Sequence, residues 1–242
     1  MRFGIVAHSS EGAALCYLTF CREGFCEMGR HMHPDVMLDG TAMGEAMPAW
    51  EAGDYAAVRS IMSKSIERLA AGGCDFFACP DNTAHIALEA DGPPLALPGL
   101  DIADIVAERA CALGLKRVAV LGTRFTMAGP VYRRALPAMG IEPCFPNESE
   151  RLDIDGIIFD ELVEGIFSER SRKRYVEIID RMRREEGCDG AALVCTEIPL
   201  LVTPDVSPVP ILDSTRLLAR AALEVCMRKR PPPDWRGGPR GG

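Results

Sequence analysis

The sequence predicts an α/β protein made of two similar halves, each built around a parallel sheet. Short apolar runs of strand length alternate along the chain with segments of helical periodicity. The tripeptide Gly-Cys-Asp opens an apolar strand at Gly73 and again at Gly187. The strand RFGIVAHSS from Arg2 matches RVAVLGTRF from Arg117, and the distance in sequence between these two strands is nearly the same as that between the two tripeptides. We therefore predict two Rossmann-like αβα domains related by a pseudo-two-fold, with the active site in the cleft between them, where the strands end.

The bulk composition narrows the function classes. The chain has 242 residues and a formal net charge of -8, which argues against a general binder of nucleic acid or anionic membranes. No apolar run approaches the roughly 20 residues that span a bilayer. The N-terminal MRFGIVAHSS is typical of a first strand and not of a signal peptide, so we expect a cytoplasmic protein.

The first half contains three predicted strands and three predicted helices. The segment 54–71 has apolar residues at helical spacing and ends at a Gly-Gly pair. Residues 91–99 (DGPPLALPG) are rich in proline and glycine, so we place the first domain boundary there. The predicted strands cover 3–7, 36–38 and 75–79, and the predicted helices cover 13–20, 54–71 and 83–90.

The rest of the chain repeats the alternation and ends in a polar tail. Its predicted strands cover 116–122, 187–195 and 209–212, and its main predicted helices cover 154–167, 174–184 and 214–227. Residues 229–242 lack apolar periodicity and predict a mobile tail. We assign residues 1–98 with 207–228 to the first domain and residues 99–206 to the second.

The ten cysteines predict reduced core residues, because no secretory signal supports disulfides. No CxxC pair exists, and Cys16, Cys21 and Cys26 are spread around a helix by their spacing of five. We therefore predict no metal site.

Cys195 follows a buried strand and precedes what the sequence indicates is a helix, with Thr196 as a natural cap. Free N–H groups at a helix N-terminus favour negative charge, so a thiol placed there has a lowered pKa and a carboxylate can bind there. Glu197 adds a further acid. The alternative is that Cys195 is a structural thiol.

Asp81 lies at the matching point of the first half, followed by Asn82 and Thr83, which can donate to a carboxylate. The alternative is that Asp81 only caps the next helix. Cys79 competes as an acid/base because it shares the same strand face, although deeper. The spacing from Gly73 favours Asp81.

These motifs resemble those of the aspartate/glutamate racemase superfamily. PDNTAH resembles PCNTAH, LVCTEIPLL resembles GCTEIPLL, VLGTRFTM resembles the strand with two threonines (here Thr123 and Thr126), and IIFDELVEGIFSERSRKRY is similar to the broad-specificity branch. The matches span residues 2–226. The resemblance implies two Rossmann-like domains, usually a homodimer, and no cofactor. It also implies two cysteines that exchange the α-proton on opposite faces of a substrate whose carboxylate is anchored on Asn, Thr and backbone N–H groups.

The first cysteine of that pattern is replaced here by Asp81. A carboxylic acid ordinarily has a pKa of about 4 and its anion is a weak base, although burial or a neighbouring thiolate raises such a pKa. The turn HSSEG lacks the usual Gly-Gly and offers Ser9 and Ser10 as substrate ligands or as helix caps. Glu164 stands where some aspartate-specific members have Lys, which argues against aspartate as the substrate.

We therefore predict a cofactor-independent racemase or epimerase of an amino acid or related small carboxylate, with Cys195 and Asp81 as acid/base pair. The alternative is a one-sided decarboxylase, isomerase, lyase or hydrolase in which Cys195 is the sole thiol acid/base or nucleophile. A silent carboxylate-binding protein is a third hypothesis. The predicted substrate-binding residues are Ser9, Ser10, Asn82, Thr83, Thr123, Thr126, Thr196 and Glu197.

Overall fold

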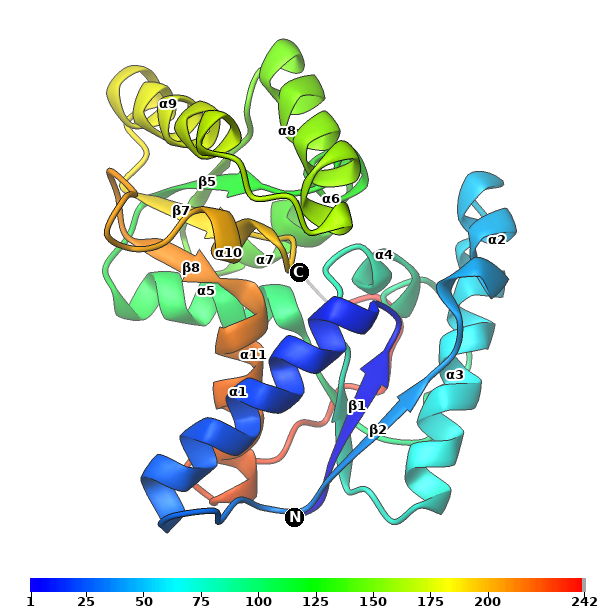
Figure 1. The fold of residues 1–242 in the computed structure, drawn as a ribbon. Helices are drawn as coiled ribbons and strands as arrows, with labels where there is room; N and C mark the ends of the chain where they lie inside the picture. Colours follow the sequence, from blue (N-terminus) through cyan, green and yellow to red (C-terminus); the bar gives the residue numbers. More distant parts are fainter. Residues whose placement is uncertain (241–242) are drawn as a thin grey trace. The chain divides into compact units, whose positions relative to one another are not determined.

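The computed structural model describes residues 1–240 and divides the chain into two compact units. The first unit contains Met1–Ile102 and the chain from Thr215 onward, and the second contains Ala103–Ser214. Each unit is an α/β layer structure around one parallel sheet (Figure 1). Among the described residues, no helix combines the length and the apolar character needed to span a membrane.

The sheet of the first unit has the strand order β2-β1-β3-β4, all parallel. Its strands are β1 (Phe3–Ala7), β2 (Val36–Gly40), β3 (Phe76–Ala78) and β4 (Gly99–Leu100). The central strands β1 and β3 are almost fully buried, as expected for parallel strands that carry helices on both faces.

Helices cover both faces of this sheet (Figure 1). The helices are α1 (Ser10–Met28), α2 (Met47–Glu51), α3 (Tyr55–Ala71), α4 (Ala84–Leu88) and α11 (Ser214–Cys226), with a 3₁₀ turn η1 (Met43–Glu45). The apolar side of α3 packs with Val6 and Phe77, while the ring of Phe20 on α1 lies 5.0 Å from that of Phe3. The Asp54 side chain begins α3 by accepting the N–H of Ala57 at 2.9 Å.

The second unit repeats this order as β6-β5-β7-β8, again all parallel. Its strands are β5 (Arg117–Leu121), β6 (Glu142–Cys144), β7 (Gly190–Leu193) and β8 (Ile211–Asp213). Each strand therefore has its counterpart at the same place in the other unit. The predicted internal repeat is confirmed at the level of strand order.

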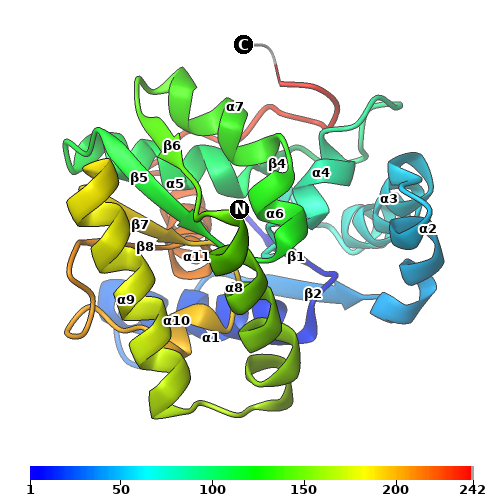
Figure 2. The ribbon, with the colours of Figure 1, turned by 90° about the horizontal axis from the view of Figure 1, so that it is seen from above.

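In the second unit, α8 and α9 lie side by side on one face of the sheet and α5 and α7 on the other (Figures 1 and 2). The helices are α5 (Ile102–Ala112), α6 (Arg124–Ala128), α7 (Val131–Ala138), α8 (Glu148–Asp160), α9 (Glu169–Glu186) and α10 (Ile198–Leu201), with a 3₁₀ turn η2 (Leu162–Glu164). A capping box between Asn147 and Glu150 begins α8.

The two Gly-Cys-Asp motifs perform the same structural task. Gly73 and Gly187 have φ angles of 81° and 71°, a conformation that glycine adopts without the strain of a Cβ. The carboxylate of Asp75 accepts the backbone N–H just before β1 at 2.7 Å, and that of Asp189 accepts the N–H at the start of β5 at 3.0 Å. Each motif therefore turns the chain out of a helix and joins it to the first strand of its unit.

The predicted domain boundaries need correction. β8 pairs with β7 in the second sheet, so residues 207–214 belong to the second unit and not to the first. β4 pairs with β3, so residues 99–102 belong to the first unit. The short strand β6 (EPC) was not predicted, because its proline and its charged first residue do not give a strand pattern.

The predicted mobile tail is wrong for its described part. Trp235 is buried, and its backbone carbonyl accepts the N–H of Gly99 at 2.7 Å. The segment therefore packs on the first unit through an aromatic anchor that a periodicity search cannot detect. Residues 241–242 of the predicted tail lie outside the described residues.

Candidate active site

Asp81 lies in the turn between β3 and α4. Its side chain is half-buried, and its Oδ1 accepts the N–H of Ala84 at 3.2 Å. The capping contact expected as the alternative from the sequence is therefore present. Asn82 beside it is 3% exposed and Thr83 is half-buried. Thr83 occupies the cap position of α4 without a side-chain cap bond.

Cys79 is fully buried, two residues before Asp81. Burial and the charge of Asp81 raise the pKa of its thiol well above the ordinary value, against the lowering effect of hydrogen bonds from the backbone N–H groups of Asp81 and His8. A buried thiol that holds its proton so firmly is a poor proton carrier. Exposure and protonation together favour Asp81 over Cys79 as the acid/base of this turn.

The turn after β1 adjoins the turn after β3, because the His8 backbone reaches the Cys79 sulfur. Ser9 caps α1 by accepting the N–H of Gly12 at 3.2 Å, and the exposed Ser10 donates to Glu11 at 2.7 Å. The capping alternative for Ser9 is thus realised. The imidazole of His8 is buried and accepts the indole N–H of Trp50 at 3.1 Å.

Cys195 lies in the corresponding turn of the second unit, between β7 and α10. Its thiol is half-buried and donates to Glu197 Oε2 at 3.0 Å. Thr196 and Glu197 are 7% and 5% exposed. The near neighbour of the thiol is therefore a buried carboxylate that can accept its proton.

The predicted capping role of Thr196 is wrong. Helix α10 begins at Ile198, with Glu197 at the cap position and no side-chain cap bond. Because α10 has only four residues, its dipole is small. The predicted stabilisation of a Cys195 thiolate by a helix N-terminus is therefore not supported. The polar partner of the thiol is instead the Glu197 carboxylate.

The turn after β5 lies beside the Cys195 turn. The two strands pair in register up to Leu121 and Leu193, and the N–H of Val194 donates to the Leu121 carbonyl at 2.8 Å. Thr123 caps α6 by accepting the N–H of Thr126 at 3.3 Å, and the two hydroxyl oxygens are 3.2 Å apart. Both threonines therefore lie at the same edge of the sheet as Cys195.

Tyr175 on α9 is a residue of this region that the sequence did not reveal. Its side chain is fully buried, and its hydroxyl has no hydrogen-bond partner among residues 1–240. Burial, followed by the charges of Cys195, Asp155 and Glu197, raises the pKa of the phenol well above its ordinary value. The helical period placed Tyr175 on the apolar side of α9, where nothing distinguished it from a core residue.

Two groups among the described residues have the spacing of metal ligands. They are Cys144, Glu186 and Cys188, and His85, Glu89 and Asp101, with the ligand atoms of each group within 4.8 Å of one another. Burial and the neighbouring Cys144 raise the pKa of the Cys188 thiol, and Glu186 pairs with Arg181 at 2.7 Å. His85 and Asp101 form an ion pair at 3.6 Å. One carboxylate of each group is therefore already paired with a basic side chain of the protein.

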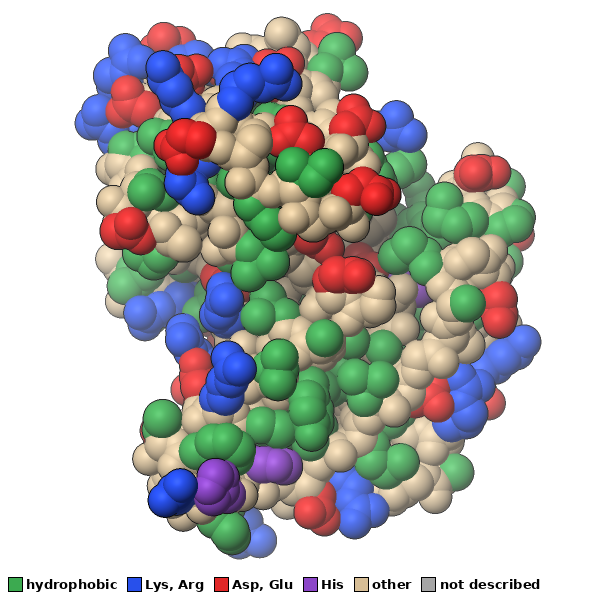
Figure 3. Space-filling view, in the orientation of Figure 1, with side chains coloured by type: hydrophobic (Ala, Val, Ile, Leu, Met, Phe, Trp, Pro, Cys, Tyr) green, Lys and Arg blue, Asp and Glu red, His purple; other side chains and the backbone are tan. Residues whose placement is uncertain are grey.

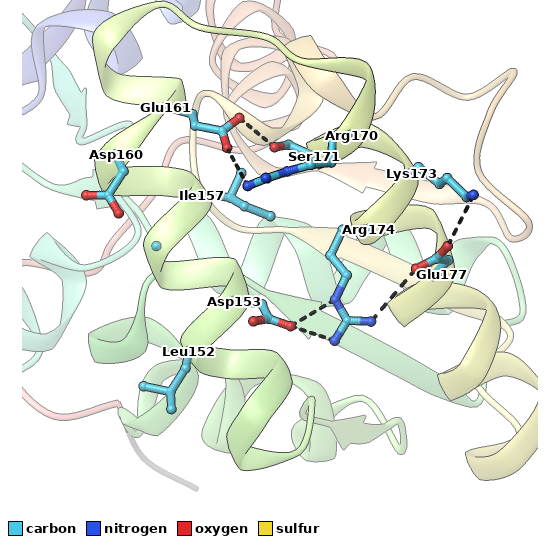
Figure 4. Close-up of a pocket in the computed structure, with 11 residues that line it drawn as sticks. Leu152, Asp153, Ile157, Asp160, Glu161, Arg170, Ser171, Lys173, Arg174 and Glu177 are labelled. Atoms are coloured by element: carbon cyan, nitrogen blue, oxygen red, sulfur yellow. Dashed lines mark hydrogen bonds and ion pairs between the residues drawn. The ribbon is translucent and has the colours of Figure 1, made fainter.

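A groove of about 610 Å³ runs between α8 and α9 (Figure 4). Several of its charges are paired with one another: Arg174 donates to Asp153 at 2.6 and 2.8 Å, and Lys173 faces Glu177 at 3.9 Å. Basic and acidic side chains alternate over the surface of α9 (Figure 3). None of the predicted site residues lines this groove, and Glu164 is exposed on η2 outside it.

The comparisons with known proteins agree with one another. Residues 27–222 match the family model described as Asp/Glu/Hydantoin racemase. The broad specificity amino-acid racemase RacX of Bacillus subtilis (strain 168) is 23% identical over 175 residues, which cover 71% of this chain and 74% of that protein.

Two solved structures are similar over most of the chain. A Yersinia pestis protein assigned provisionally as an Asp/Glu racemase has a TM-score of 0.83 and 28% identity, with coverage of 93% of this chain and 99% of that one. An aspartate racemase homologue from Pyrococcus horikoshii OT3 has a TM-score of 0.81 and 24% identity over the same shares. The second likeness establishes the fold alone.

Proposed function

Because the chain belongs to the Asp/Glu/Hydantoin racemase family, we propose that it is a cofactor-independent racemase or epimerase of an amino acid or related small carboxylate. The observation that carries the proposal is the equivalence of two turns. Asp81 follows β3 and Cys195 follows β7, and these strands hold the same place in the two sheets. Each repeat thus offers one proton-carrying side chain at the end of its second central strand.

In the proposed reaction, one of the two groups removes the α-proton and the other delivers a proton to the opposite face. When Cys195 is the base, its thiol proton passes first to Glu197, the acceptor that lies 3.0 Å away. The thiolate then takes the α-proton, and protonated Asp81 donates to the other face of the carbanion. The reverse reaction exchanges these roles. The mechanism requires that both side chains reach the same α-carbon.

The substrate carboxylate needs donors that stabilise the negative charge developing at the α-carbon. We assign this role to Asn82, Thr83, Thr123, Thr126 and Thr196, with Ser9 and Ser10 at the neighbouring turn. Glu197 contacts the thiol and serves it as proton acceptor. The proposal includes a homodimer, as the family resemblance implies, and a cytoplasmic location.

The broad specificity in the name of the Bacillus relative supports substrates beyond aspartate and glutamate. Glu164 supports the same assignment, because the resemblance places it where some aspartate-specific members have Lys, and a carboxylate cannot pair with a second substrate carboxylate.

The test is α-proton exchange in deuterated water, followed by NMR for a panel of L- and D-amino acids. We expect exchange with inversion for the wild-type protein. For Cys195→Ala we expect no inversion, and no exchange from the enantiomer whose α-proton Cys195 removes. The matched control is Cys111→Ala, because Cys111 is an exposed thiol outside the candidate site. Normal exchange in Cys195→Ala overturns the mechanism. Asp81→Cys is expected to retain or raise racemisation, and a folded but inactive variant contradicts the assignment of Asp81.

The difference between the two groups supports a second candidate, a one-sided enzyme of the same fold. Asp81 is a carboxylate and Cys195 a thiol, so only one side has a thiol acid/base or nucleophile. Such an enzyme would be a decarboxylase, isomerase, lyase or hydrolase of a small carboxylic acid. Product formation without inversion in the same NMR experiment supports it over the racemase.

A further inference from the structure

His85 is a buried histidine directly behind the turn that carries Asp81. It lies on α4 with no exposed surface. Its Nε2 is 3.1 Å from the carbonyl oxygen of Cys79, and its Nδ1 is 3.6 Å from Asp101 Oδ2. A carbonyl oxygen only accepts, so Nε2 carries a hydrogen, and the carboxylate favours a second one on Nδ1. His85 therefore holds the first residue of the Cys79-Pro80-Asp81 turn while it is itself held by Asp101.

The charge state of His85 agrees with this geometry. Burial alone lowers the pKa of the imidazole, but the nearby Asp101 carboxylate, followed by the charge of Glu89 and the hydrogen bond to the Cys79 carbonyl, raises it above its ordinary value. The side chain of Asp101 is only 1% exposed. The pair is thus a buried ion pair, in which each partner depends on the other.

The C-terminal segment, residues 229–240, covers this pair. The indole of Trp235 stacks on the His85 ring with a centroid distance of 6.0 Å and an interplanar angle of 15°. An aromatic face of this kind stabilises a cation. The indole N–H donates to the Gly238 carbonyl at 3.1 Å, which fixes the ring in place.

Backbone hydrogen bonds hold the segment on the elements that carry His85 and Asp101. The N–H groups of Leu95 and Gly99 donate to the carbonyls of Arg236 and Trp235 at 2.8 and 2.7 Å. The N–H of Gly238 donates to the Leu88 carbonyl at the end of α4 at 2.9 Å. The segment thus joins α4 to the chain that leads through β4 to Asp101.

We propose that the C-terminal segment and the His85–Asp101 pair together position the turn that carries Asp81, which makes this segment a working part of the candidate active site. His85 is a positioning residue here, because it acts through the Cys79 carbonyl and not on substrate. The importance of this position for catalysis rests on the proposed function. The positioning itself is measurable without any substrate.

The first experiment measures backbone hydrogen exchange of residues 79–88 by mass spectrometry. The amide nitrogen of Gln occupies the place of Nε2, and that of Asn the place of Nδ1, so His85→Gln retains the bond to Cys79 and His85→Asn loses it. We expect His85→Asn and Trp235→Leu to raise exchange in this region at least about tenfold, the equivalent of about 1.4 kcal/mol in the opening equilibrium. His85→Gln and the exposed control Asp234→Ala are expected to retain most of the protection.

Unchanged protection in both His85→Asn and Trp235→Leu overturns the proposal, whatever the activity. If His85→Asn does not fold, the pair Trp235→Leu and Asp234→Ala decides alone. Loss of protection in these variants supports the positioning role even if the wild-type protein exchanges no α-proton. In that case the proposed function fails and the positioning role stands.

The second experiment measures α-proton exchange from each enantiomer separately. In a two-base site, one enantiomer loses its proton to Asp81 and the other to Cys195. His85→Asn and Trp235→Leu are expected to lower kcat at least about tenfold for the Asp81 enantiomer, since a small misplacement of a catalytic group is costly. Exchange of the Cys195 enantiomer is expected to change less, and His85→Gln to recover activity. Equal losses for both enantiomers contradict a role specific to the Asp81 turn.

Discussion

The turns after β3 and β7 occupy the same place in two repeats of one architecture, yet they are supported differently. The first reads Asp81-Asn82-Thr83 and the second Cys195-Thr196-Glu197. Each turn contains one carboxylate. In the first turn the carboxylate is the candidate proton carrier, and in the second it accepts a hydrogen bond from the candidate proton carrier, the thiol.

The residues that lie behind the two turns also differ. A buried thiol and a buried ion pair lie behind Asp81, whereas a buried neutral phenol lies on the Cys195 side. In the two repeats the reactive group lies at the same backbone position. The reactive side chain and the residues that support it both differ. Three substitutions test this comparison, in order of decreasing effect.

Asp101→Asn tests the ion pair behind the first turn. Removing one partner of a buried pair is expected to lower the free energy of unfolding by about 3 kcal/mol near pH 6. Urea unfolding measures the effect. The matched control is Glu142→Gln, which removes one partner of a half-exposed pair with Arg117 and is expected to cost less than about 1 kcal/mol.

The pH dependence of Asp101→Asn gives a sharper result, because the sign of the slope should reverse. In the wild-type protein the pKa of His85 is raised in the folded state. The contribution of charged His85 to the free energy of unfolding is therefore complete below the pKa of about 6.5 that His85 has in the unfolded chain. It is lost as the pH rises through the pKa that His85 has in the folded protein. In the variant, burial still lowers the pKa of His85, but the charge of Asp101, which mainly opposes this effect, is absent. Stability should therefore rise with pH over this range. Parallel slopes in the two proteins would show that Asp101 does not set the charge of His85.

Glu197→Gln tests the partner of the thiol in the second turn. The amide does not accept a proton from Cys195, so we expect exchange from the Cys195 enantiomer to fall about a hundredfold, the low end of general acid–base effects. Exchange from the Asp81 enantiomer should fall less. Glu148→Gln in the exposed first turn of α8 is the control and should exchange at the wild-type rate. A uniform loss for both enantiomers would make Glu197 a structural residue.

Much of this comparison was predictable from the sequence. The two Gly-Cys-Asp motifs and the apolar strands after them predicted the repeat and placed Asp81 and Cys195 at strand ends. These features are local, because a glycine with positive φ and a buried strand leave a pattern in neighbouring residues. For the same reason, the sequence also predicted as alternatives that the side chains of Asp81 and Ser9 cap the helices that follow them.

The remaining features depend on contacts between distant parts of the chain. The segment around Trp235 was predicted to be a mobile tail, because a single aromatic residue that anchors a segment produces no hydrophobic periodicity. β8 was assigned to the wrong unit because the pairing partner of an edge strand is not encoded in its own four or five residues. Tyr175 and the His85–Asp101 pair were not predicted as parts of the site, since the buried polar contacts that distinguish them exist only in the folded chain.

Tyr175→Phe tests the neutral support of the second turn and has the smallest expected effect. A buried hydroxyl without a partner carries a desolvation penalty, so its removal should stabilise the unliganded protein by about 1 kcal/mol in urea unfolding. Tyr17→Phe is the control, because Tyr17 is exposed on α1 and should leave stability unchanged. The first turn has no equivalent, since removal of His85 or Asp101 is expected to destabilise it. A destabilised Tyr175→Phe would mean that the phenol is hydrogen-bonded in solution and that both turns rest on polar support.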